Sequence, residues 1–490
     1  MKNSSAGQDG IDIKVIKSVI NNLLQPLSHI CNLSLTKGNI PNELKIARVV
    51  PIHKKGTKNN FSNYRPVSVL PAFSKLFERL VYDRLINYFD KNNVLSENQF
   101  GFRKYRSTCL ALNTLVDRFH DTIEKNELMI GLFIDLSRAF DTMSHEILLR
   151  KLNFYGIRGI ALDWIADYLS NRKQFVMYNN VKSKMADVNI GVPQGSILGP
   201  LLFLIYVNDL SNISNKLSYI QFADDTNIFI TGKSLLNIST IVNEEMLLIN
   251  EWVSNNRLSL NISKTNYMIM SSQAKKYDSN DCVISINGIT LERVHETKFL
   301  GIILDDKLIW KSHIDFICNK ISKCMGILIK ARKVLGTNPL LILYNSLVKP
   351  YFTYCIIIWG NTYTKYLHKI QIIQKKIIRI LTFSEFKAHT GPLFIKHKIM
   401  TASQLYDYFS GIFIFKSIHD LLPIRFSKMF IHNFALRKSL DLRANFCTRK
   451  VCEFSIRFNG PKVWNKLTHI TKASKSIFSF KRNLKNELFK

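Results

Sequence analysis

Two short apolar runs joined by a turn with adjacent aspartates constrain this sequence more than any other feature. Residues 219–222 and 227–230 have strand-like composition, and residues 223–226 between them form a turn. One Asp would be ordinary there, because its side chain bonds nearby backbone groups. Asp224 and Asp225 side by side repel each other and gain nothing structurally unless a cation lies beside them. Taken alone, the pair leaves a solvated turn and a cation site equally open.

A third acidic residue follows another apolar run. Residues 131–134 are typical of a buried strand, and Asp135 comes directly after them. Three carboxylates at a strand end and a hairpin turn could hold two Mg²⁺ ions, since this ion prefers hard oxygen ligands. Two ions about 4 Å apart can activate a 3′-hydroxyl and stabilise leaving pyrophosphate. Asp141 is set apart from this group, because the N-cap of the next helix explains it.

The chain is strongly basic, and its charge is uneven. Its 490 residues include 68 Lys and Arg against 36 Asp and Glu, a formal net charge of +32. Residues 1–300 hold 35 basic and 27 acidic residues, whereas residues 301–490 hold 33 and 9. A surface that serves only solubility mixes the two signs. The C-terminal part is therefore expected to bind a polyanion. An acidic membrane surface would also fit the charge, but the sequence contains no basic amphipathic anchor that would favour it.

The composition of the chain and the absence of targeting signals in its sequence indicate a soluble intracellular protein, in the nucleus or the cytoplasm. The chain has no apolar run of membrane-spanning length and no basic-then-apolar signal segment at its start. Its eight cysteines contain no CxxC pair, as expected for free thiols in a reducing compartment. The length allows two to four domains, and 46% hydrophobic residues suffice for real cores.

Short β-like runs alternate with helical ones up to about residue 304, and a helical pattern follows. Helices are expected at 143–155, 201–207 and 235–253, with strand-like runs at 132–134, 267–270 and 298–304. Residues 51–71 are predicted to be rich in loops. Beyond residue 310 the helical spacing is carried by Ile314, Ile317, Ile321, Cys324 and Leu328. This pattern predicts an α+β body followed by a basic helical region.

Three motifs in order resemble the palm motifs of reverse transcriptases: FIDLSRAFD at 133–141, GVPQGSILGP at 191–200 and FADD at 222–225. NYRPVS at 63–68 resembles the fingers motif, and QFGFR at 99–103 and FLG at 299–301 are similar to further family motifs. The sequences that flank these motifs resemble those of the non-LTR (LINE-type) retrotransposon branch, jockey-like elements in particular. The resemblance continues through 346–351 and 357–360 and covers nearly the whole chain.

The resemblance implies a right-hand polymerase fold that copies RNA into DNA. Fingers and palm with an antiparallel sheet would be followed by a helical thumb and a basic, mostly helical C-terminal region. The expected partners are template RNA, a DNA primer or nicked target DNA, and dNTPs added to a primer 3′-hydroxyl. The implied division is 1–34 upstream of the fingers, 35–304 for fingers and palm, 305–360 for a thumb-like region and 361–490 for nucleic-acid binding.

Carried over to this sequence, the resemblance also implies residue roles. Metal ions, two Mg²⁺ with Mn²⁺ as a substitute, would be held by Asp135, Asp224 and Asp225, and Lys264 would protonate pyrophosphate. Phe140 would exclude a ribose 2′-hydroxyl, and Gln194 would lie under the nucleotide and template base. The remaining implied groups are triphosphate contacts at Lys54, Lys55 and Arg65 and a primer grip at Phe299, Leu300 and Gly301.

Each role has a plainer alternative. Phe140 could be a core aromatic, Gln194 part of an ordinary tight connection, and the lysines a solvated surface. Residues 299–301 could be a plain β-strand with no function. For the whole chain, the alternatives are a catalytically silent RNA-binding relic and a two-metal nuclease. A nuclease needs neither a group that excludes the 2′-hydroxyl nor an Arg that holds a triphosphate.

The stretch SAGQDGI at 5–11 resembles the family's segment just upstream of the fingers. We therefore expect this chain to begin after the endonuclease that elements of this type carry, and to have no nicking activity.

Overall fold

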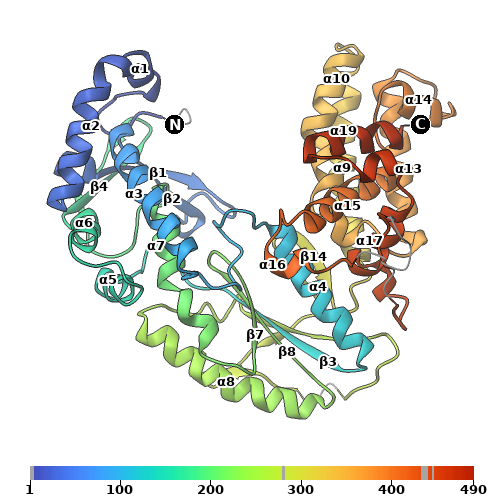
Figure 1. The fold of residues 1–490 in the computed structure, drawn as a ribbon, viewed down its shortest axis with the longest axis horizontal. Helices are drawn as coiled ribbons and strands as arrows, with labels where there is room; N and C mark the ends of the chain where they lie inside the picture. The colour runs from blue at the N-terminus through green and yellow to red at the C-terminus, as the bar shows by residue number, and fades with distance from the viewer. Residues whose placement is uncertain (1–4, 279–281, 432–439, 444–445, 490) are drawn as a thin grey trace.

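The chain folds into two arms that rise from a central β-sheet, so the ribbon has the outline of a U (Figure 1). The computed structural model describes residues 5–278, 282–431, 440–443 and 446–489. Helices and mainly antiparallel sheets occur together, which confirms the predicted α+β class. None of the helices within these ranges is long and apolar enough to cross a membrane.

The central sheet forms the palm and has the strand order β12-β9-β3-β8-β7. Its middle strand, β3, is apolar and buried along its whole length, because helices cover both faces of the sheet. Successive side chains of a strand point to opposite faces. Met129 and Phe133 accordingly join the core on the α4 side, while Ile130 and Leu132 join the core on the α8 side. The strands are β3 (Leu128–Ile134), β7 (Ser218–Phe222), β8 (Asp225–Gly232), β9 (Asn266–Met270) and β12 (Glu292–Arg293).

The two helices that cover the palm sheet begin at serine N-caps. The Ser107 hydroxyl accepts from the Leu110 backbone N–H at the start of α4 (Thr108–Glu124), at 3.3 Å. Ser234 accepts from Asn237 at the start of α8 (Leu235–Asn255). These bonds satisfy backbone donors that the first helical turn leaves free. The observed α8 confirms the helix predicted at 235–253.

The fingers arm is built on a second sheet, in which β1 (Ile46–His53) pairs with β2 (Tyr64–Val69) and lies parallel to β4 (Arg172–Tyr178). The prediction of a loop-rich stretch at 51–71 was therefore wrong in part, because β1 and β2 form a hairpin through it. Pro66 is tolerated because β2 is an edge strand. The other elements of this arm are β5 (Val181–Lys182), β6 (Ala186–Val188), η1 (Asn42–Lys45), η2 (Phe61–Asn63), α1 (Ile13–Ser18), α2 (Ile20–Lys37), α3 (Ala72–Lys91), α5 (His145–Phe154), α6 (Ile160–Leu169), α7 (Leu198–Tyr206) and η3 (Asn208–Asn212).

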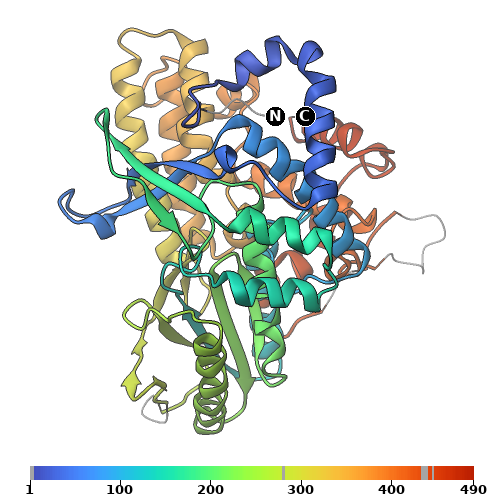
Figure 2. The same ribbon diagram turned by 90° about the vertical axis from the view of Figure 1, so that its left-hand side faces the viewer.

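The second arm is helical and begins with α9 (Lys311–Ala331). Ile314, Ile317, Ile321 and Leu328 are buried along one side of α9, which confirms the predicted helical spacing. Figures 1 and 2 show α9 and α10 side by side in this arm. The helices that follow α9 are α10 (Thr337–Leu343), η5 (Tyr344–Val348), α11 (Lys349–Thr353), α12 (Ile356–Trp359), α13 (Thr364–Leu381), α14 (Gly391–Lys396), α15 (Ala402–Ile418), α16 (Ile424–Ser427), η6 (Cys452–Phe454), α17 (Ile456–Asn465), α18 (His469–Lys472) and α19 (Ile477–Leu488).

One hydrophobic core joins the palm helix α4 to the thumb and the C-terminal helices. Polar contacts close the same junction: Glu124 accepts from the backbone N–H groups of Thr448 and Arg449, at 3.0–3.1 Å. Arg457 forms an ion pair with Asp121 at 2.7 Å. The C-terminal region therefore docks on the palm and shares its core with the thumb.

Candidate active site

The aspartate hairpin is tighter than the sequence predicts. Phe222 pairs directly with Asp225, so only Ala223 and Asp224 form the turn between β7 and β8. Ala223 has a left-handed backbone with φ of 58°, which is uncommon for a residue with a Cβ. Buried Gln99 holds this turn: its Oε1 accepts from Ala223 N–H at 3.0 Å. The QFGFR motif therefore supports the hairpin, a role that its sequence did not reveal.

Asp135 reaches the hairpin because β3 and β8 are antiparallel neighbours. Ile134 pairs with Thr226 in this register, so the residue after β3 lies beside the start of β8. Two side chains contact the Asp135 carboxylate at the same oxygen, Oδ2: Asn261 Nδ2 at 2.9 Å and Lys264 Nζ at 3.2 Å. The Asn261 backbone N–H also donates to the Asp135 carbonyl at 2.8 Å. The sequence singled out Lys264, whereas Asn261 carried no signal of its own.

The neighbouring carboxylates affect the protonation of Asp225. The pKa of Asp225 is raised to about 6, by desolvation and by the negative charges of Asp224 and Asp135, and Lys54 opposes the rise. The Asp225 side chain is exposed, so the neighbouring charges are the cause that the geometry supports most directly. Within the described residues, no group of three or more His, Cys, Asp or Glu side chains is gathered closely enough to hold a metal ion. The three aspartates are thus electrostatic neighbours without forming a closed ligand set.

The first two palm motifs meet beside this site. Gln194 Nε2 donates to Asp141 Oδ1 at 2.8 Å, and Val192 N–H donates to the Phe140 carbonyl at 3.0 Å. The assignment of Asp141 as a helix N-cap was wrong, since Ser144 occupies the N-cap position of α5. Burial raises the pKa of Asp141, and the bond from Gln194 opposes the rise. Asp141 therefore positions Gln194.

Phe140 is half-buried and packed on one side. Its ring stacks on Phe203 of α7, with centroids 4.4 Å apart, and meets Phe102 edge-on at 6.4 Å. Aromatic pairs in such offset and edge-on arrangements are mutually attractive. The packing fixes the ring in place, which both a core role and a role in nucleotide selection require.

The second palm motif also binds the fingers. Ser68 of β2 donates its backbone N–H to the Gln194 carbonyl at 2.7 Å. Gly195 lies so close to β2 that a Cβ there would fall 2.5 Å from the Ser68 carbonyl oxygen, and its φ is 126°. Only glycine fits this approach without a shift of the backbone.

The basic residues predicted for the triphosphate lie on the fingers hairpin and are all exposed. Lys54 is near enough to affect Asp225 electrostatically. No hydrogen bond or ion pair joins Lys55 or Arg65 to the described carboxylates. The structure thus brings Lys54 toward the site and leaves the other two on the surface of the fingers.

The segment predicted as one strand at 298–304 is a hairpin, so that prediction was wrong. Strands β13 (Glu296–Phe299) and β14 (Ile302–Asp305) are joined by a two-residue turn at Leu300 and Gly301. Both turn residues have positive φ, 46° and 84°, as tight hairpins with this twist require, and glycine supplies that conformation without strain. Phe299 packs against Phe133 of β3, two residues before Asp135. The turn is therefore anchored on the strand that carries the first aspartate.

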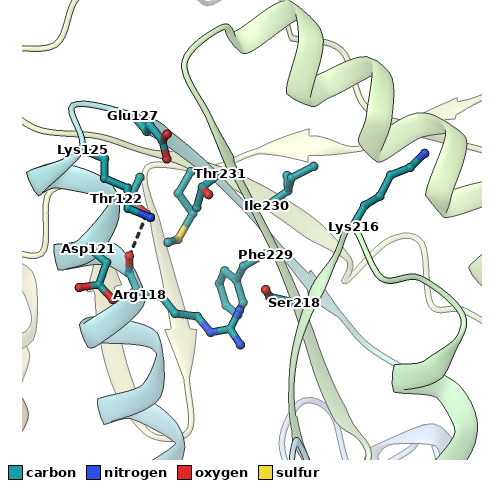
Figure 3. Close-up of a pocket in the computed structure, with 11 residues that line it drawn as sticks. Arg118, Asp121, Thr122, Lys125, Glu127, Lys216, Ser218, Phe229, Ile230 and Thr231 are labelled. Carbon is teal, nitrogen blue, oxygen red and sulfur yellow. Dashed lines mark hydrogen bonds between the residues drawn. The ribbon is translucent and has the colours of Figure 1, made fainter. Parts of the chain in front are cut away.

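Two cavities lie away from the carboxylates. One, of about 320 Å³, is lined by Gly301, thumb helix residues and aromatic side chains that include Tyr351 and Tyr354. The other, of about 200 Å³, lies between α4 and the far end of the β7–β8 hairpin (Figure 3). Arg118 extends there from α4 toward Phe229 and Ser218. Four residue pairs separate Ser218 from the aspartate turn, roughly 13 Å along the strand, so this cavity is not the carboxylate site.

Comparison with known proteins identifies the class. Residues 52–304, which contain all three carboxylates and most of the fingers, match the family model described as reverse transcriptase (RNA-dependent DNA polymerase). The chain belongs to this family, and the predicted right-hand polymerase fold is confirmed. Members of the family generally use divalent metal ions.

Curated relatives refine the assignment. The chain is 29% identical over 385 residues to the RNA-directed DNA polymerase from mobile element jockey of Drosophila melanogaster, covering 76% of this chain and 41% of the relative. It is 25% identical to the probable polymerase from transposon X-element of the same species, covering 81% and 44%. The predicted place among LINE-type, jockey-like reverse transcriptases is confirmed.

The chain spans about two fifths of the length of these relatives. Among solved structures, telomerase from Candida albicans in complex with a fragment of telomeric RNA is similar at 13% identity, over 76% of this chain and 66% of that chain. The TM-score of 0.36 is too low to support a functional conclusion.

Proposed function

We propose that this chain is an RNA-directed DNA polymerase of a non-LTR retrotransposon, which adds dNTPs to a DNA primer on an RNA template. The observation that carries the proposal is the meeting of Asp135 with the Asp224–Asp225 turn, where each charge raises the pKa of Asp225. Repulsion between carboxylates destabilises a purely structural turn, whereas divalent cations bound beside them would offset it.

Asp135, Asp224 and Asp225 are the residues that would hold Mg²⁺, with Mn²⁺ as a substitute. Their oxygen-only chemistry fits these ions, and Asp135 Oδ1 takes no part in the bonds to Asn261 and Lys264. Two such ions supply Lewis-acid activation of the 3′-hydroxyl and stabilisation of the leaving pyrophosphate. Asn261 and Lys264 orient the Asp135 carboxylate, and Lys264 is also the proposed proton donor.

The surrounding residues would select and place the nucleotide. We assign Phe140 to exclusion of the ribose 2′-hydroxyl, since Phe203 stacks on its ring and holds it in place. Gln194, oriented by Asp141, would lie under the nascent base pair. Lys54 acts electrostatically on Asp225 and would contact the triphosphate, with Lys55 and Arg65 as further contacts on the same hairpin.

The β13–β14 turn would hold the primer end. Phe299 fixes the hairpin on β3, and the Tyr354 hydroxyl donates to the Leu300 carbonyl at 2.6 Å, which ties the turn to the thumb. The primer grip would therefore move together with both palm and thumb. We keep the division into 1–34, 35–304, 305–360 and 361–490 as a proposal, although the packed core continues across residue 360.

The partners are proposed from charge and family. Template RNA and a DNA primer, or nicked target DNA, would lie against the basic thumb and C-terminal region, where basic residues outnumber acidic ones by 33 to 9. We also propose an intracellular location, in the nucleus or the cytoplasm, which the eight free cysteines support.

The decisive experiment is extension of a DNA primer on an RNA template by the purified chain with Mg²⁺ and dNTPs. Asp224→Asn should abolish extension while RNA binding is kept. An unmodified chain that binds RNA but never extends the primer would support the silent alternative. Degradation of labelled substrate without dNTPs, lost in Asp224→Asn, would support the nuclease alternative.

A further inference from the structure

The free end of the thumb arm presents exposed aromatic and basic side chains together. Two connections meet there, the one between α9 and α10 and the one between α13 and α14 (Figures 1 and 2). The two helices that lead to them, α9 and α13, pack against each other. We use the name thumb-tip surface for six residues of these connections: Arg332, Lys333, Val334, Phe383, Phe386 and Lys387.

The apolar members of the thumb-tip surface are strongly exposed. Phe386 is 80% exposed, Val334 83% and Phe383 46%. Single exposed apolar residues are ordinary on a protein surface, and this chain has others, such as Phe154 at 81%. The thumb-tip surface differs from these single residues because basic side chains lie beside its aromatic ones.

Arg332 and Phe383 join the two connections. The guanidinium carbon of Arg332 lies 4.8 Å from the centroid of the Phe383 ring, a cation–π arrangement. Exposed Lys333 and Lys387 flank the pair along the two segments, and Glu385 is the one acidic residue in 332–334 and 382–390. Aromatic faces next to net positive charge are the combination that single-stranded nucleic acid requires.

The connection after α13 is held in a fixed shape. Ser384 N–H donates to the Arg379 carbonyl at 3.1 Å, and Ala388 N–H donates to the Glu385 carbonyl at 3.1 Å. Arg379 Nε donates to the Ala388 carbonyl at 2.9 Å, which closes the loop back on α13. An ordered loop presents its aromatic rings with little further loss of conformational entropy on binding.

We propose that the thumb-tip surface binds single-stranded RNA, by stacking of bases on Phe386 and Phe383 and by contact of phosphates with Lys333 and Lys387. Bases of a duplex are already stacked and paired, so a duplex offers the phosphates alone. An acidic protein segment would use the lysines, but its carboxylates would not stack on the phenylalanines as bases do. The surface lies at the end of the arm away from the palm sheet, and so is separate from the proposed polymerase site.

The test uses the full chain with its palm occupied. An excess of a short unlabelled primer–template duplex is added first, and binding of a labelled ten-nucleotide RNA single strand is then followed by fluorescence anisotropy. Phe386→Ala and Phe383→Ala should each weaken binding about 5-fold or more, the low end of what one stacked base contributes. Lys333→Gln with Lys387→Gln should reduce the log–log salt slope by roughly 0.7 per lost contact.

Phe154→Ala is the matched control, because Phe154 is equally exposed but lies on the fingers arm. It should leave single-strand binding unchanged. Primer extension on a short template is measured in parallel for every variant, so that loss of the polymerase itself would be recognised separately.

Three results would overturn the proposal. The first is unchanged affinity for the single strand in the double variant Phe383→Ala/Phe386→Ala. The second is an equal loss of affinity for a labelled duplex of the same length. The third is displacement of the RNA by polyglutamate as effective as that by unlabelled RNA, which would assign the surface to acidic partners.

Discussion

The side chain of Gln99 holds the backbone of Ala223, 124 residues further along the chain. Its Oε1 accepts from both Ala223 N–H, at 3.0 Å, and Gly101 N–H, at 2.8 Å, and its Nε2 donates to the Ala223 carbonyl at 3.5 Å. The turn that presents two repelling carboxylates is therefore fixed from outside the hairpin. The geometry of the turn therefore depends on an uncharged residue that bonds the backbone of the turn and not the aspartate side chains.

Replacement of Gln99 should impair chemistry more than binding. Gln99→Leu leaves the left-handed turn at Ala223 without its partner, and a misplacement of about 1 Å costs on the order of 100-fold in rate. We expect extension to slow about 10- to 100-fold, with RNA affinity unchanged, in single-turnover assays. Gln221→Leu is the matched control, since buried Gln221 lies on β7 and neither of its side-chain polar atoms has a partner in the structure. Equal losses in the two variants would refute the role of Gln99.

Lys264 can act as a proton donor or only as a cation beside Asp135, and two substitutions separate these roles. Arginine keeps the positive charge but does not release a proton near neutral pH. If Lys264 protonates pyrophosphate, both Lys264→Gln and Lys264→Arg should extend primers roughly 100-fold more slowly. Recovery of most of the rate in Lys264→Arg would show that the charge beside Asp135 is sufficient.

Phe140→Ala should relax the choice of sugar. The substitution opens space where the ring now stacks on Phe203, so a ribose 2′-hydroxyl would be accepted. We expect the preference for dNTPs over rNTPs to fall at least 10-fold, measured as the ratio of kcat/KM values. Phe203→Leu, which loosens the support but keeps the ring of Phe140, should change the ratio less. A ratio that stays the same in an active Phe140→Ala protein would assign Phe140 to the core.

Asp117 of α4 should make the protein less stable at high pH. Burial raises the pKa of Asp117 to about 7, partly offset by the positive charges of Arg457 and Arg425, and its Oδ1 has no partner in the structure. A carboxyl with a raised folded pKa stabilises fully below its unfolded value, about 4, and that stability is lost as the pH rises through about 7. Asp117→Asn mimics the protonated form, so its Tm should exceed that of the unmodified chain by a few degrees at pH 8 and by little at pH 4.

Thermal unfolding followed by intrinsic fluorescence at several pH values measures this difference. Asp121→Asn is the comparison, because Asp121 lies one turn further along α4 but is exposed and paired with Arg457. A Tm gain for Asp117→Asn that is the same at pH 4 and pH 8 would show that folding does not raise the pKa of Asp117.

The sequence by itself determined the elements and the chemical character of the site. Strand β3, helix α9 and the aspartate hairpin are set by local apolar periodicity, which acts over a few residues and can be read directly. The three palm motifs fixed the family in the same way, because their residues are contiguous.

Only the tertiary structure decided the contacts between segments far apart in the chain. The bond from Gln99 to Ala223, the bond from Gln194 to Asp141 and the docking of Thr448 on Glu124 join residues 124, 53 and 324 positions apart. Likewise, Phe299 of the β13–β14 hairpin packs against Phe133 of β3, 166 positions earlier. Such contacts leave no periodic signal, because a hydrogen bond or a packed ring constrains one residue at each end and nothing between them.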